Sequence, residues 1–425
     1  MTSPSVLQSQ SCHSLADWLC YIEQSHPIEK IELGLGRVLQ VASRGALQQL
    51  PDRVILIAGT NGKGTTARTL EQLLLAQGYS VGVYSSPHLL KFNERLRLNG
   101  TDVSDELWVE GLRQVEALRQ DVALTYFEFT TLAAFAILKQ QEPDFCLIEV
   151  GLGGRLDATN IVEPELSIVT TVDLDHQDWL GNDRETIGRE KAGVFRPGRH
   201  AVVGDLQMPQ SVAEVAADLG ARLTCAGHDY HVESDGQQFD WHFGASQLLA
   251  LPAPAVPVQN VATALTTLAL LDVLPAEAVI RTVLQELTLA GRMQWLSRQP
   301  AILLDVAHNP QSARYLASAL AQLAGQYTQI HLVVGMLKDK DIREALVAFC
   351  GNSWRWHLVS LPGVRGAGSD LLQQALPATE QSCQYRQLSD VYSCIEAASA
   401  DELFVVFGSF VTVSAMLSLW PQENV

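Results

Sequence analysis

The feature that most constrains the fold of this chain is an apolar run, Arg53 to Ala58, that leads into the string Gly59-Thr60-Asn61-Gly62-Lys63-Gly64-Thr65-Thr66. The run has the composition of a buried strand, and the residues after the string have the pattern of an amphipathic helix. Glycines allow the backbone angles that turn N–H groups inward, and a helix N-terminus attracts anions. Lys63 supplies a positive charge, and Thr65 or Thr66 offers a hydroxyl to Mg²⁺. The stretch therefore predicts a phosphate-binding loop.

The spacing of this loop departs from the common nucleotide-binding motif. The pattern G-x-x-x-x-G-K-[ST] would place a glycine at Ile57 and a serine or threonine at Gly64. A glycine-rich turn with an unrelated lysine is the alternative interpretation. The strand, glycines, lysine, paired threonines and helix nevertheless occur in the order that phosphate binding requires. We therefore favour an ATP-binding loop formed by Asn61, Gly62, Lys63, Gly64 and Thr65.

The composition limits the classes of protein to which the chain can belong. At 425 residues, of which 47% are hydrophobic, the chain exceeds what one core supports, so we expect two domains. Its 29 basic and 47 acidic residues give a formal net charge of -18, which argues against nucleic-acid binding. No run reaches the ~18 apolar residues of a membrane span, and the N-terminus lacks a signal-peptide pattern. We expect no membrane association, a cytoplasmic location and a monomer.

The seven cysteines lie scattered from Cys12 to Cys394 and form no C-x-x-C pair. Their odd number and wide spacing favour reduced, mostly buried thiols over a disulfide framework or a zinc site.

Strand and helix patterns alternate along the first part of the chain. After the loop, we expect a helix from Thr65 to Gln77 and a strand from Val81 to Ser85, which makes the opening β-α-β. Ser104 is a candidate N-cap for the helix that follows it. Further strands are predicted at Asp144 to Val150, Leu166 to Val172 and Ala201 to Val203. Helices are predicted from a Ser104 cap to about Arg119, from after Phe129 to Lys139, across Arg184 to Val194 and through Val212 to Leu219.

The later part of the chain predicts a second, smaller unit. His228 to Phe243 has the pattern of a hairpin, and a proline-rich link and two helices lead to Gly291-Arg292. Strands are expected beyond it at Ile302 to Val306, Ile330 to Gly335, His357 to Leu361 and Phe404 to Phe407. The predicted fold class is α/β, with a P-loop nucleotide-binding domain on a mostly parallel sheet, residues 1–295, and a smaller Rossmann-like α/β domain, residues 296–425.

Several strings together resemble one family, the bacterial bifunctional dihydrofolate synthase/folylpolyglutamate synthases of the Mur ligase superfamily. The resemblance spans nearly the whole chain and follows the family's order. It rests on the phosphate loop and on Tyr84-Ser85-Ser86-Pro87-His88-Leu89, Phe92-Asn93-Glu94-Arg95, Glu149 to Asn160, Asp175-His176, Glu190-Lys191-Ala192-Gly193 and Asp305-Val306-Ala307-His308-Asn309-Pro310.

The resemblance implies an ATP-dependent ligase that joins L-glutamate to 7,8-dihydropteroate through an acyl phosphate and adds further glutamates to reduced folates. It also implies Mg²⁺, expected as two ions, on Ser86, Glu149 and His176. All three follow or end predicted strands, where parallel sheets present ligands. The family's matching lysine is carbamylated, which implies a modified, catalytic Lys191.

The resemblance assigns further contacts to the nucleotide and to the pterin. Asn260, Arg292 and Asp305 would contact ATP, and His308 would act beside the nucleotide. Pterin contacts are implied at Thr125, Tyr126, Phe127, Glu128, Leu156, Asp157 and Ala158, beside the stretch from Leu33 to Val38. Arg95, Arg97 and Arg155 are candidate anion contacts, although surface salt bridges are the commoner role of an arginine.

Each residue also has a structural interpretation. Ser86 before Pro87 is compatible with a plain turn, His176 with a polar loop residue, and Lys191 with a solvated helical lysine. Glu149 is different, because an acidic residue at the end of a buried strand loses solvation unless it meets a cation or donors. The rival functions are a folylpolyglutamate synthase alone, a cell-wall amino-acid ligase of the same superfamily, and a P-loop switch protein that hydrolyses ATP as a timer.

Overall fold

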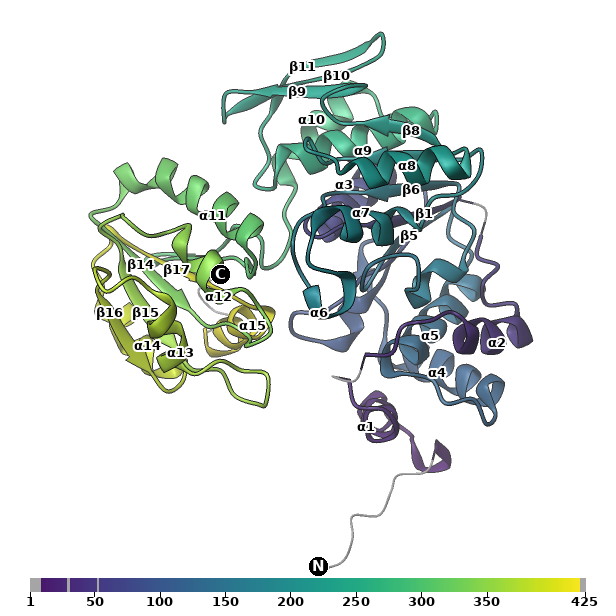
Figure 1. Cartoon of the computed structure of the whole chain (residues 1–425), viewed down its shortest axis with the longest axis horizontal. Coiled ribbons are helices and arrows are strands. Elements are labelled where there is room, and N and C mark those ends of the chain that lie inside the picture. Colours follow the sequence, from purple (N-terminus) through teal and green to yellow (C-terminus); the bar gives the residue numbers. More distant parts are fainter. Residues whose placement is uncertain (1–8, 29–30, 52, 421–425) are drawn as a thin grey trace, which may run out of the picture. The chain divides into compact units, whose positions relative to one another are not determined.

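A computed structural model describes residues 9–28, 31–51 and 53–420, and all structural statements refer to these residues. Contacts between residues divide the chain into two compact units, which are described separately (Figure 1). The first unit contains the described residues of Met1–Val172, Asp183–Ala253 and Pro257–Glu286. The second contains Asp173–Asn182, Pro254–Val256 and the described residues of Leu287–Val425.

The first unit is built on an eight-stranded sheet with the order β4-β3-β2-β5-β1-β6-β7-β8. All neighbours from β2 to β8 pair in parallel, while β3 and β4 form an antiparallel edge. The strands are β1 (Arg53–Ala58), β2 (Val81–Tyr84), β3 (Leu96–Leu98), β4 (Thr101–Asp102), β5 (Phe145–Glu149), β6 (Leu166–Val169), β7 (His200–Val203) and β8 (Arg222–Cys225). Strand β1 lies at the centre because its apolar side chains are buried on both faces, as parallel sheets require.

Helices surround this sheet, and some of them start at a capping side chain. Ser104 accepts a hydrogen bond from the Leu107 N–H at 3.4 Å, and Thr125 with Glu128 forms a capping box. The helices are α1 (Leu15–Ser25), α2 (Gly36–Gly45), α3 (Lys63–Leu75), α4 (Asp105–Arg119), α5 (Tyr126–Gln141), α7 (Arg184–Ala192), α8 (Gln210–Leu219), α9 (Val258–Leu270) and α10 (Glu277–Glu286), with short 3₁₀ turns η1 (Ser9–Ser11), η2 (Phe92–Arg95) and η3 (Ala158–Ile161).

The predicted hairpin at His228 to Phe243 is part of a larger element. Strands β9 (Tyr230–Ser234) and β10 (Gln238–Phe243) pair antiparallel, and β11 (Ser246–Pro252) adds a third strand beside β10. Trp241 anchors this sheet, since it is fully buried and its indole N–H donates to the Thr266 hydroxyl on α9 at 3.1 Å. The third strand was not predicted, because its sequence lacks a period-two alternation and ends at Pro252, where the proline-rich link begins.

The second unit contains a six-stranded sheet with the order β12-β13-β17-β14-β15-β16. Five strands are parallel, and β12 pairs antiparallel with β13 at one edge. The strands are β12 (Gln294–Arg298), β13 (Ala301–Leu304), β14 (Gln329–Val334), β15 (Arg355–Val359), β16 (Ser382–Tyr385) and β17 (Glu402–Phe407). The prediction of a second parallel α/β unit is confirmed, although the two edge strands were not foreseen.

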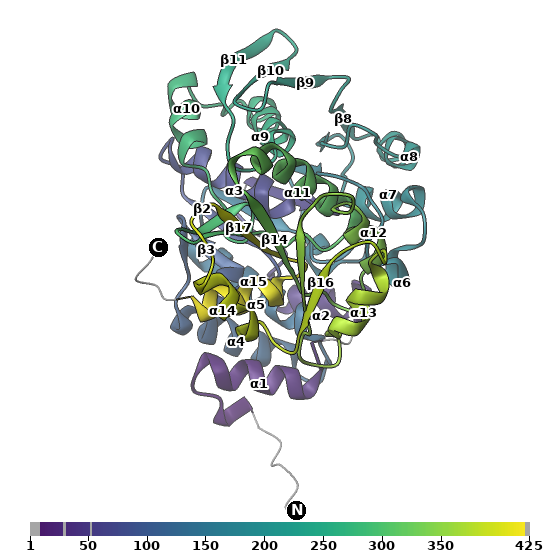
Figure 2. The same ribbon diagram turned by 90° about the vertical axis from the view of Figure 1, so that its left-hand side faces the viewer.

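Helices cover both faces of the second sheet. One core joins the sheet to α11 (Pro310–Leu323), α12 (Ile342–Val347) and α13 (Ser369–Ala375), through residues such as Leu316, Leu346 and Leu372. Helix α14 (Ser389–Glu396) and α15 (Phe410–Leu419) lie beside each other (Figure 2), and the rings of Tyr392 and Trp420 are 5.7 Å apart. The short elements η4 (Ala324–Gln326) and α6 (Gln177–Leu180) complete the unit.

Two further observations concern composition. All seven cysteines are free, but only Cys12 and Cys146 are buried, so the prediction of mostly buried thiols was wrong. Cysteine alone does not reveal burial when it lies on the outer face of a helix or on an edge strand. None of the described helices has both the length and the apolar composition needed to cross a membrane.

The second sheet encloses a polar chain on the face opposite the α11 core. His331 Nδ1 lies 2.9 Å from His357 Nε2, and His357 Nδ1 lies 3.0 Å from the Tyr385 hydroxyl. The ring of His331 stacks on Phe404, with centroids 4.3 Å apart. Burial, together with smaller contributions from neighbouring positive charges, lowers the pKa of each imidazole to about 4. The Glu402 carboxylate, 3.6 Å from His331 Nε2, is too distant to offset this loss of solvation.

We therefore predict that the second unit loses stability in mild acid. Both pKa values fall from 6.5 in the unfolded chain to about 4 in the folded unit, so the unfolded chain binds more protons between these pH values. This stability is fully present above pH 6.5 and is lost as the pH falls toward about 4, by about 3 kcal/mol or more for the pair. Urea unfolding followed from pH 7.5 to 4.5 measures it.

The double variant His331→Gln/His357→Gln should flatten this pH dependence, because neither glutamine titrates. His228→Gln is the matched control, since it makes the same substitution at a side chain that is 84% exposed. An unchanged pH dependence in the double variant would contradict the assignment.

Candidate active site

The phosphate loop joins β1 to α3, and two glycines shape it. Gly59 has φ 148° and Gly62 has φ 87°, both in the region that favours glycine. A Cβ on Gly59 would lie 1.8 Å from the Thr170 hydroxyl, and one on Gly62 would lie 2.6 Å from Asn260 Oδ1. The structure thus brings Asn260, on α9, against the loop that carries the other predicted ATP contacts of the first unit, Asn61, Lys63, Gly64 and Thr65.

Two threonines after β6 hold the loop in place. The Thr60 N–H donates to the Thr171 carbonyl at 2.8 Å, and the Asn61 N–H donates to the Thr171 hydroxyl at 3.0 Å. The Thr170 hydroxyl donates to the Asn61 carbonyl at 2.6 Å. Sequence analysis missed both threonines, although their position at the carboxyl end of an apolar strand is a signal that could have found them.

Lys63, the first residue of α3, folds back over the loop. Its ammonium donates to the Gly59 carbonyl at 3.1 Å and to the Thr60 carbonyl at 3.4 Å, and it lies 3.9 Å from Glu149 Oε1. Both side chains are largely buried, which strengthens their attraction. The Thr66 hydroxyl, one turn along the helix, is buried and has no hydrogen-bond partner among the described residues. A buried hydroxyl without a partner is costly, and a bound cation or phosphate oxygen would satisfy it.

Two of the predicted metal ligands lie at one edge of the first sheet. Glu149 ends β5, and Ser86 follows β2 by two residues. These strands pair in parallel, with Tyr84 opposite Ile148, so their carboxyl ends meet at the same edge. A carboxylate and a hydroxyl are oxygen donors that suit Mg²⁺. Among the described residues, no group of three or more histidine, cysteine, aspartate and glutamate side chains forms a metal cluster by itself.

Lys191 lies on α7 and is 4% exposed, so it is not the solvated lysine that helical position alone suggests. The glycine-rich loop after β5 packs directly on its backbone. A Cβ on Gly154 would lie 2.8 Å from the Lys191 carbonyl, and the Arg155 N–H donates to the Glu190 carbonyl at 2.8 Å. The strings around Glu149 and Lys191, forty residues apart in the sequence, are therefore adjacent in the fold.

The three stretches implied to line the pterin site also come together in the first unit. The Gly34 N–H donates to the Leu156 carbonyl at 3.3 Å, and Arg37 forms an ion pair with Glu128 at 3.2 Å. A Cβ on Gly151 would lie 2.5 Å from the ring of Phe127, so glycine lets this ring approach the backbone. Phe127 is partly exposed, whereas the neighbouring Tyr126, Thr125 and Ala158 are buried.

The two acidic side chains of this group already have structural partners. Glu128 accepts from the Thr125 N–H at 2.7 Å in its capping box. Asp157 accepts from the Leu152 N–H at 2.8 Å and from the Thr159 N–H at 2.9 Å. Burial raises the pKa of Asp157, and these donors lower it in part. Both carboxylates therefore order the backbone of the site, whatever else they contact.

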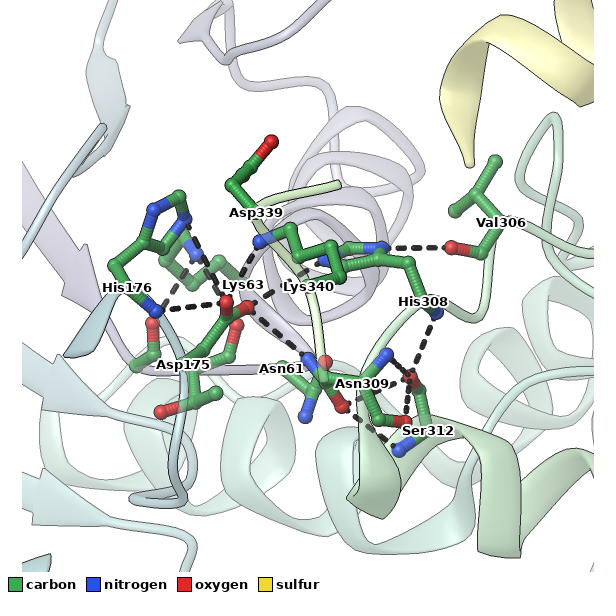
Figure 3. A network of polar contacts seen from close by, with 12 residues as sticks. Asn61, Lys63, Asp175, His176, Val306, His308, Asn309, Ser312, Asp339 and Lys340 are labelled. Atoms are coloured by element: carbon green, nitrogen blue, oxygen red, sulfur yellow. Dashed lines mark hydrogen bonds and ion pairs between the residues drawn. The ribbon is translucent and has the colours of Figure 1, made fainter. Parts of the chain in front are cut away.

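In the second unit, the buried carboxylate of Asp175 is the centre of a polar network (Figure 3). One oxygen lies 2.6 Å from the Lys340 ammonium, and the other accepts from the Asn309 amide at 3.2 Å and lies 3.5 Å from His308 Nε2. Burial alone would raise the pKa of Asp175, but the His308 hydrogen bond and the Lys340 charge hold it well below its usual range. Lys340 was not predicted, although the charged string Lys338-Asp339-Lys340-Asp341 after β14 was a visible signal.

The segment of Asp175 also carries His176, the third predicted metal ligand. His176 is the N-cap of α6 with φ 51°, and its side chain is 37% exposed. Its N–H donates to Asp175 at 2.8 Å, so the network that fixes Asp175 also fixes the backbone of His176. Ser86 and Glu149 belong to the first unit and His176 to the second.

The remaining nucleotide-side residues lie together in the second unit. Asp305 follows β13 and accepts from the Met293 N–H at 3.0 Å and the Ala307 N–H at 2.8 Å. Burial raises the pKa of Asp305, and the charge of Arg292 partly opposes this. Arg292 stacks over the Phe410 ring at 5.3 Å, and His308 Nδ1 lies 2.8 Å from the Val306 carbonyl. A carboxyl group (Asp305), an imidazole (His308) and a guanidinium (Arg292) are thus brought together in the second unit.

Comparison with known proteins identifies the relatives of this chain. Residues 57–232 match the Mur ligase middle domain, and residues 291–410 match the Mur ligase glutamate ligase domain. The dihydrofolate synthase/folylpolyglutamate synthase of Escherichia coli is 42% identical over 413 residues, which is 96% of each chain.

Solved structures agree in fold over nearly the whole length. A bifunctional folylpolyglutamate synthase/dihydrofolate synthase with Mn, AMPPNP and L-glutamate bound has a TM-score of 0.90 and 45% identity, over 97% of this chain and 99% of that one. The Escherichia coli protein FolC in complex with DHPP and ADP has a TM-score of 0.92 and 40% identity, over 97% and 98%. The α/β fold class is thereby confirmed, and the chain belongs to the dihydrofolate synthase/folylpolyglutamate synthase family of the Mur ligases.

Proposed function

We propose that this protein is an ATP-dependent ligase that joins L-glutamate to 7,8-dihydropteroate, forming dihydrofolate, and adds further glutamates to reduced folates. The observation that carries the proposal is the 42% identity to the Escherichia coli dihydrofolate synthase/folylpolyglutamate synthase over 96% of each chain. The phosphate loop and the buried groups at the ends of β2 and β5 give the reaction a physical basis.

The reaction must first activate a carboxylate, which is a poor electrophile. A carboxylate oxygen attacks the γ-phosphorus of ATP, the bond from that phosphorus to the β-bridging oxygen breaks, and ADP leaves. The glutamate amine then attacks the acyl carbon, a C–N bond forms, phosphate leaves, and the amine loses a proton. Positioning and charge neutralisation dominate such transfers. Lys63 supplies that neutralisation, because its ammonium already lies at the loop and opposite Glu149.

The residues present suit ATP and a divalent metal, as the Mn and AMPPNP in a related structure also support. Ser86, Glu149 and His176 offer oxygen and imidazole donors, and the unpaired Thr66 hydroxyl is a further oxygen at the loop. Bound metal would polarise the phosphate oxygens and orient the acceptor carboxylate. We propose Mg²⁺ as the ion and two ions as the number.

We further propose how the work is divided along the chain. Residues 1–295 would bind ATP and the pterin, with the pterin at the partly exposed Phe127 and its neighbours. Residues 296–425 would complete the ATP and glutamate site through His308 and Asp305, and Arg292 would contact ATP. We also propose a cytoplasmic location and a monomeric state, which stay predictions.

The first test of the function is the dependence of ATP turnover on the acceptor acid. With Mg²⁺ and glutamate present, the protein should release phosphate from ATP when given dihydropteroate, and release should fall to background without it. A parallel assay with tetrahydrofolate measures the second activity. Turnover with tetrahydrofolate alone would support a folylpolyglutamate synthase without the first step.

Other outcomes point to the other rivals. ATP hydrolysis that ignores pterin and glutamate would support a switch protein. Turnover with UDP-linked muramyl substrates would support a cell-wall ligase.

A second prediction concerns Lys63→Ala. Removing the ammonium takes away charge compensation in the transition state, an effect of about 3–4 kcal/mol, so turnover should fall about 100- to 1000-fold. Dihydropteroate binding, measured without ATP, should stay within about twofold, which also shows that the variant is folded. Near-normal turnover would overturn the phosphate-loop assignment.

A third prediction is that Lys191 is carbamylated and acts through negative charge. A buried lysine can lose its proton and capture CO₂, and the carbamate would attract a metal that the ammonium repels. Mass measurement of the native protein should show one added CO₂ on Lys191. Lys191→Ala should lose activity, with partial rescue by acetate, while Lys191→Arg should stay inactive because guanidinium keeps its positive charge. Full activity of Lys191→Arg would refute the carbamate.

A further inference from the structure

The turn η2, Phe92–Arg95, holds a buried arginine whose charge has no structural explanation. Two of its four side chains have clear packing roles. Phe92 is 6% exposed and packs edge-on against Trp108, with ring centroids 4.6 Å apart. The Asn93 amide donates to the Val103 carbonyl at 2.9 Å and to Asp105 at 2.8 Å. These contacts fix the turn to the first turn of α4 and the residues before it.

Glu94 fixes the loop that precedes the turn. Its carboxylate accepts from the N–H groups of Leu89 at 2.6 Å, Leu90 at 2.8 Å and Lys91 at 2.7 Å. Three donors satisfy this carboxylate, so Glu94 has a structural partner set that does not involve the neighbouring arginine. The loop and the turn therefore form a rigid support for whatever Arg95 does.

Arg95 is 6% exposed, and its side chain is positioned by one hydrogen bond and two aromatic rings. Its Nε donates to His88 Nδ1 at 3.0 Å, and its guanidinium lies 5.3 Å from the centre of the Phe92 ring and 5.8 Å from that of Tyr126. None of the carboxylates in the described ranges forms an ion pair with it. Its two terminal nitrogens have no hydrogen bond within the described chain and are not among the enclosed, unsatisfied atoms. They therefore present an open fork at the end of a buried side chain.

A buried guanidinium without a carboxylate is unfavourable, since arginine stays charged and loses its hydration on burial. Contacts with the two aromatic faces offset only part of this cost. His88 supplies no negative charge to balance the guanidinium, because its Nδ1 accepts the hydrogen bond from Arg95 Nε as a neutral ring nitrogen. The fork geometry of the open nitrogens matches a carboxylate, which it can bind through two parallel hydrogen bonds.

The position of Arg95 indicates which carboxylate it receives. Its side chain contacts Tyr126, in the stretch proposed to bind the pterin. Its carbonyl accepts from the Ser85 N–H at 2.9 Å, next to the proposed metal ligand Ser86. The acceptor acid has a pterin at one end and a carboxylate at the other, so it must extend from the first place toward the second.

Resting on the proposed function, we propose that Arg95 binds the carboxylate of the pterin-bearing acceptor acid and makes that carboxylate a requirement for tight binding. Arg95 is thus a specificity-determining residue, and the contacts of the other three residues of η2 fix the position of its backbone.

The test compares two ligands on three proteins, without ATP or glutamate. The ligands are 7,8-dihydropteroate and its analogue with aniline in place of the aminobenzoate, which lacks only the carboxylate. Arg95→Met, which keeps an unbranched apolar side chain, should weaken dihydropteroate binding about 10- to 100-fold and leave the analogue within about twofold. Arg113→Met, at an exposed position on α4, removes the same charge and should change neither ligand.

Each other outcome overturns the inference. Equal weakening of both ligands would make Arg95 a packing residue, and no change in either would leave its charge without a role. In turnover assays, a raised KM for glutamate with an unchanged KM for dihydropteroate would assign Arg95 to the amine substrate instead. If Arg95→Met does not fold, Arg95→Lys keeps the charge without the fork and should still weaken dihydropteroate severalfold more than the analogue.

The wild-type protein separates this inference from the proposed function. If the wild-type protein turns over dihydropteroate but binds dihydropteroate and the analogue equally tightly, the Arg95 assignment is wrong and the proposed function stands. If it binds neither ligand, the proposed function on which the assignment rests is wrong.

Discussion

The structure depends first on the parallel pairing of β1 with β5 on one side and β6 on the other. This register brings three chain segments to one edge of the sheet. There the phosphate loop follows β1, Glu149 ends β5, and Thr170 and Thr171 follow β6. Because the loop's backbone groups bond to Thr170 and Thr171, they are satisfied without a helix or sheet of their own. The shape of the loop therefore depends on these partners as well as on Gly59 and Gly62, which supply the positive φ angles and permit the close approaches.

In the second unit, the functional residues also follow the carboxyl ends of the strands of its own sheet, but buried charges hold them in place. Its strand ends supply Asp305 and the charged string that contains Lys340, and these side chains meet partners in low-dielectric surroundings. The pair of Asp175 and Lys340 is almost fully enclosed, so either residue alone would be a buried, uncompensated charge. The pair therefore ties the segment that carries His176 to the loop after β14.

The sequence predicted the family, the ligase class and the order of the main elements, and the comparisons confirm the first two. Long apolar runs such as Phe145–Glu149 and capped helices such as Asp105–Arg119 were predictable because local composition determines them. The partners Thr171 and Lys340 were not, because which strands are neighbours depends on the whole sheet and not on any window of sequence. The edge strands β12 and β16 were also not predicted, because half-exposed strands lack a continuous apolar run. The assignments of individual site residues stay predictions.

The path of the chain has a consequence for recombination. By its contacts Asp173–Asn182 belongs to the second unit, although the residues on both sides of it in the sequence belong to the first. A gene cut at Glu286 would therefore encode the first unit together with a fragment of the second, and that fragment would carry Asp175 without Lys340 or Asn309. The part from Leu287 onward is consequently not interchangeable by itself. A chimera between homologous chains would have to exchange this ten-residue insert together with the part that carries Lys340 and Asn309.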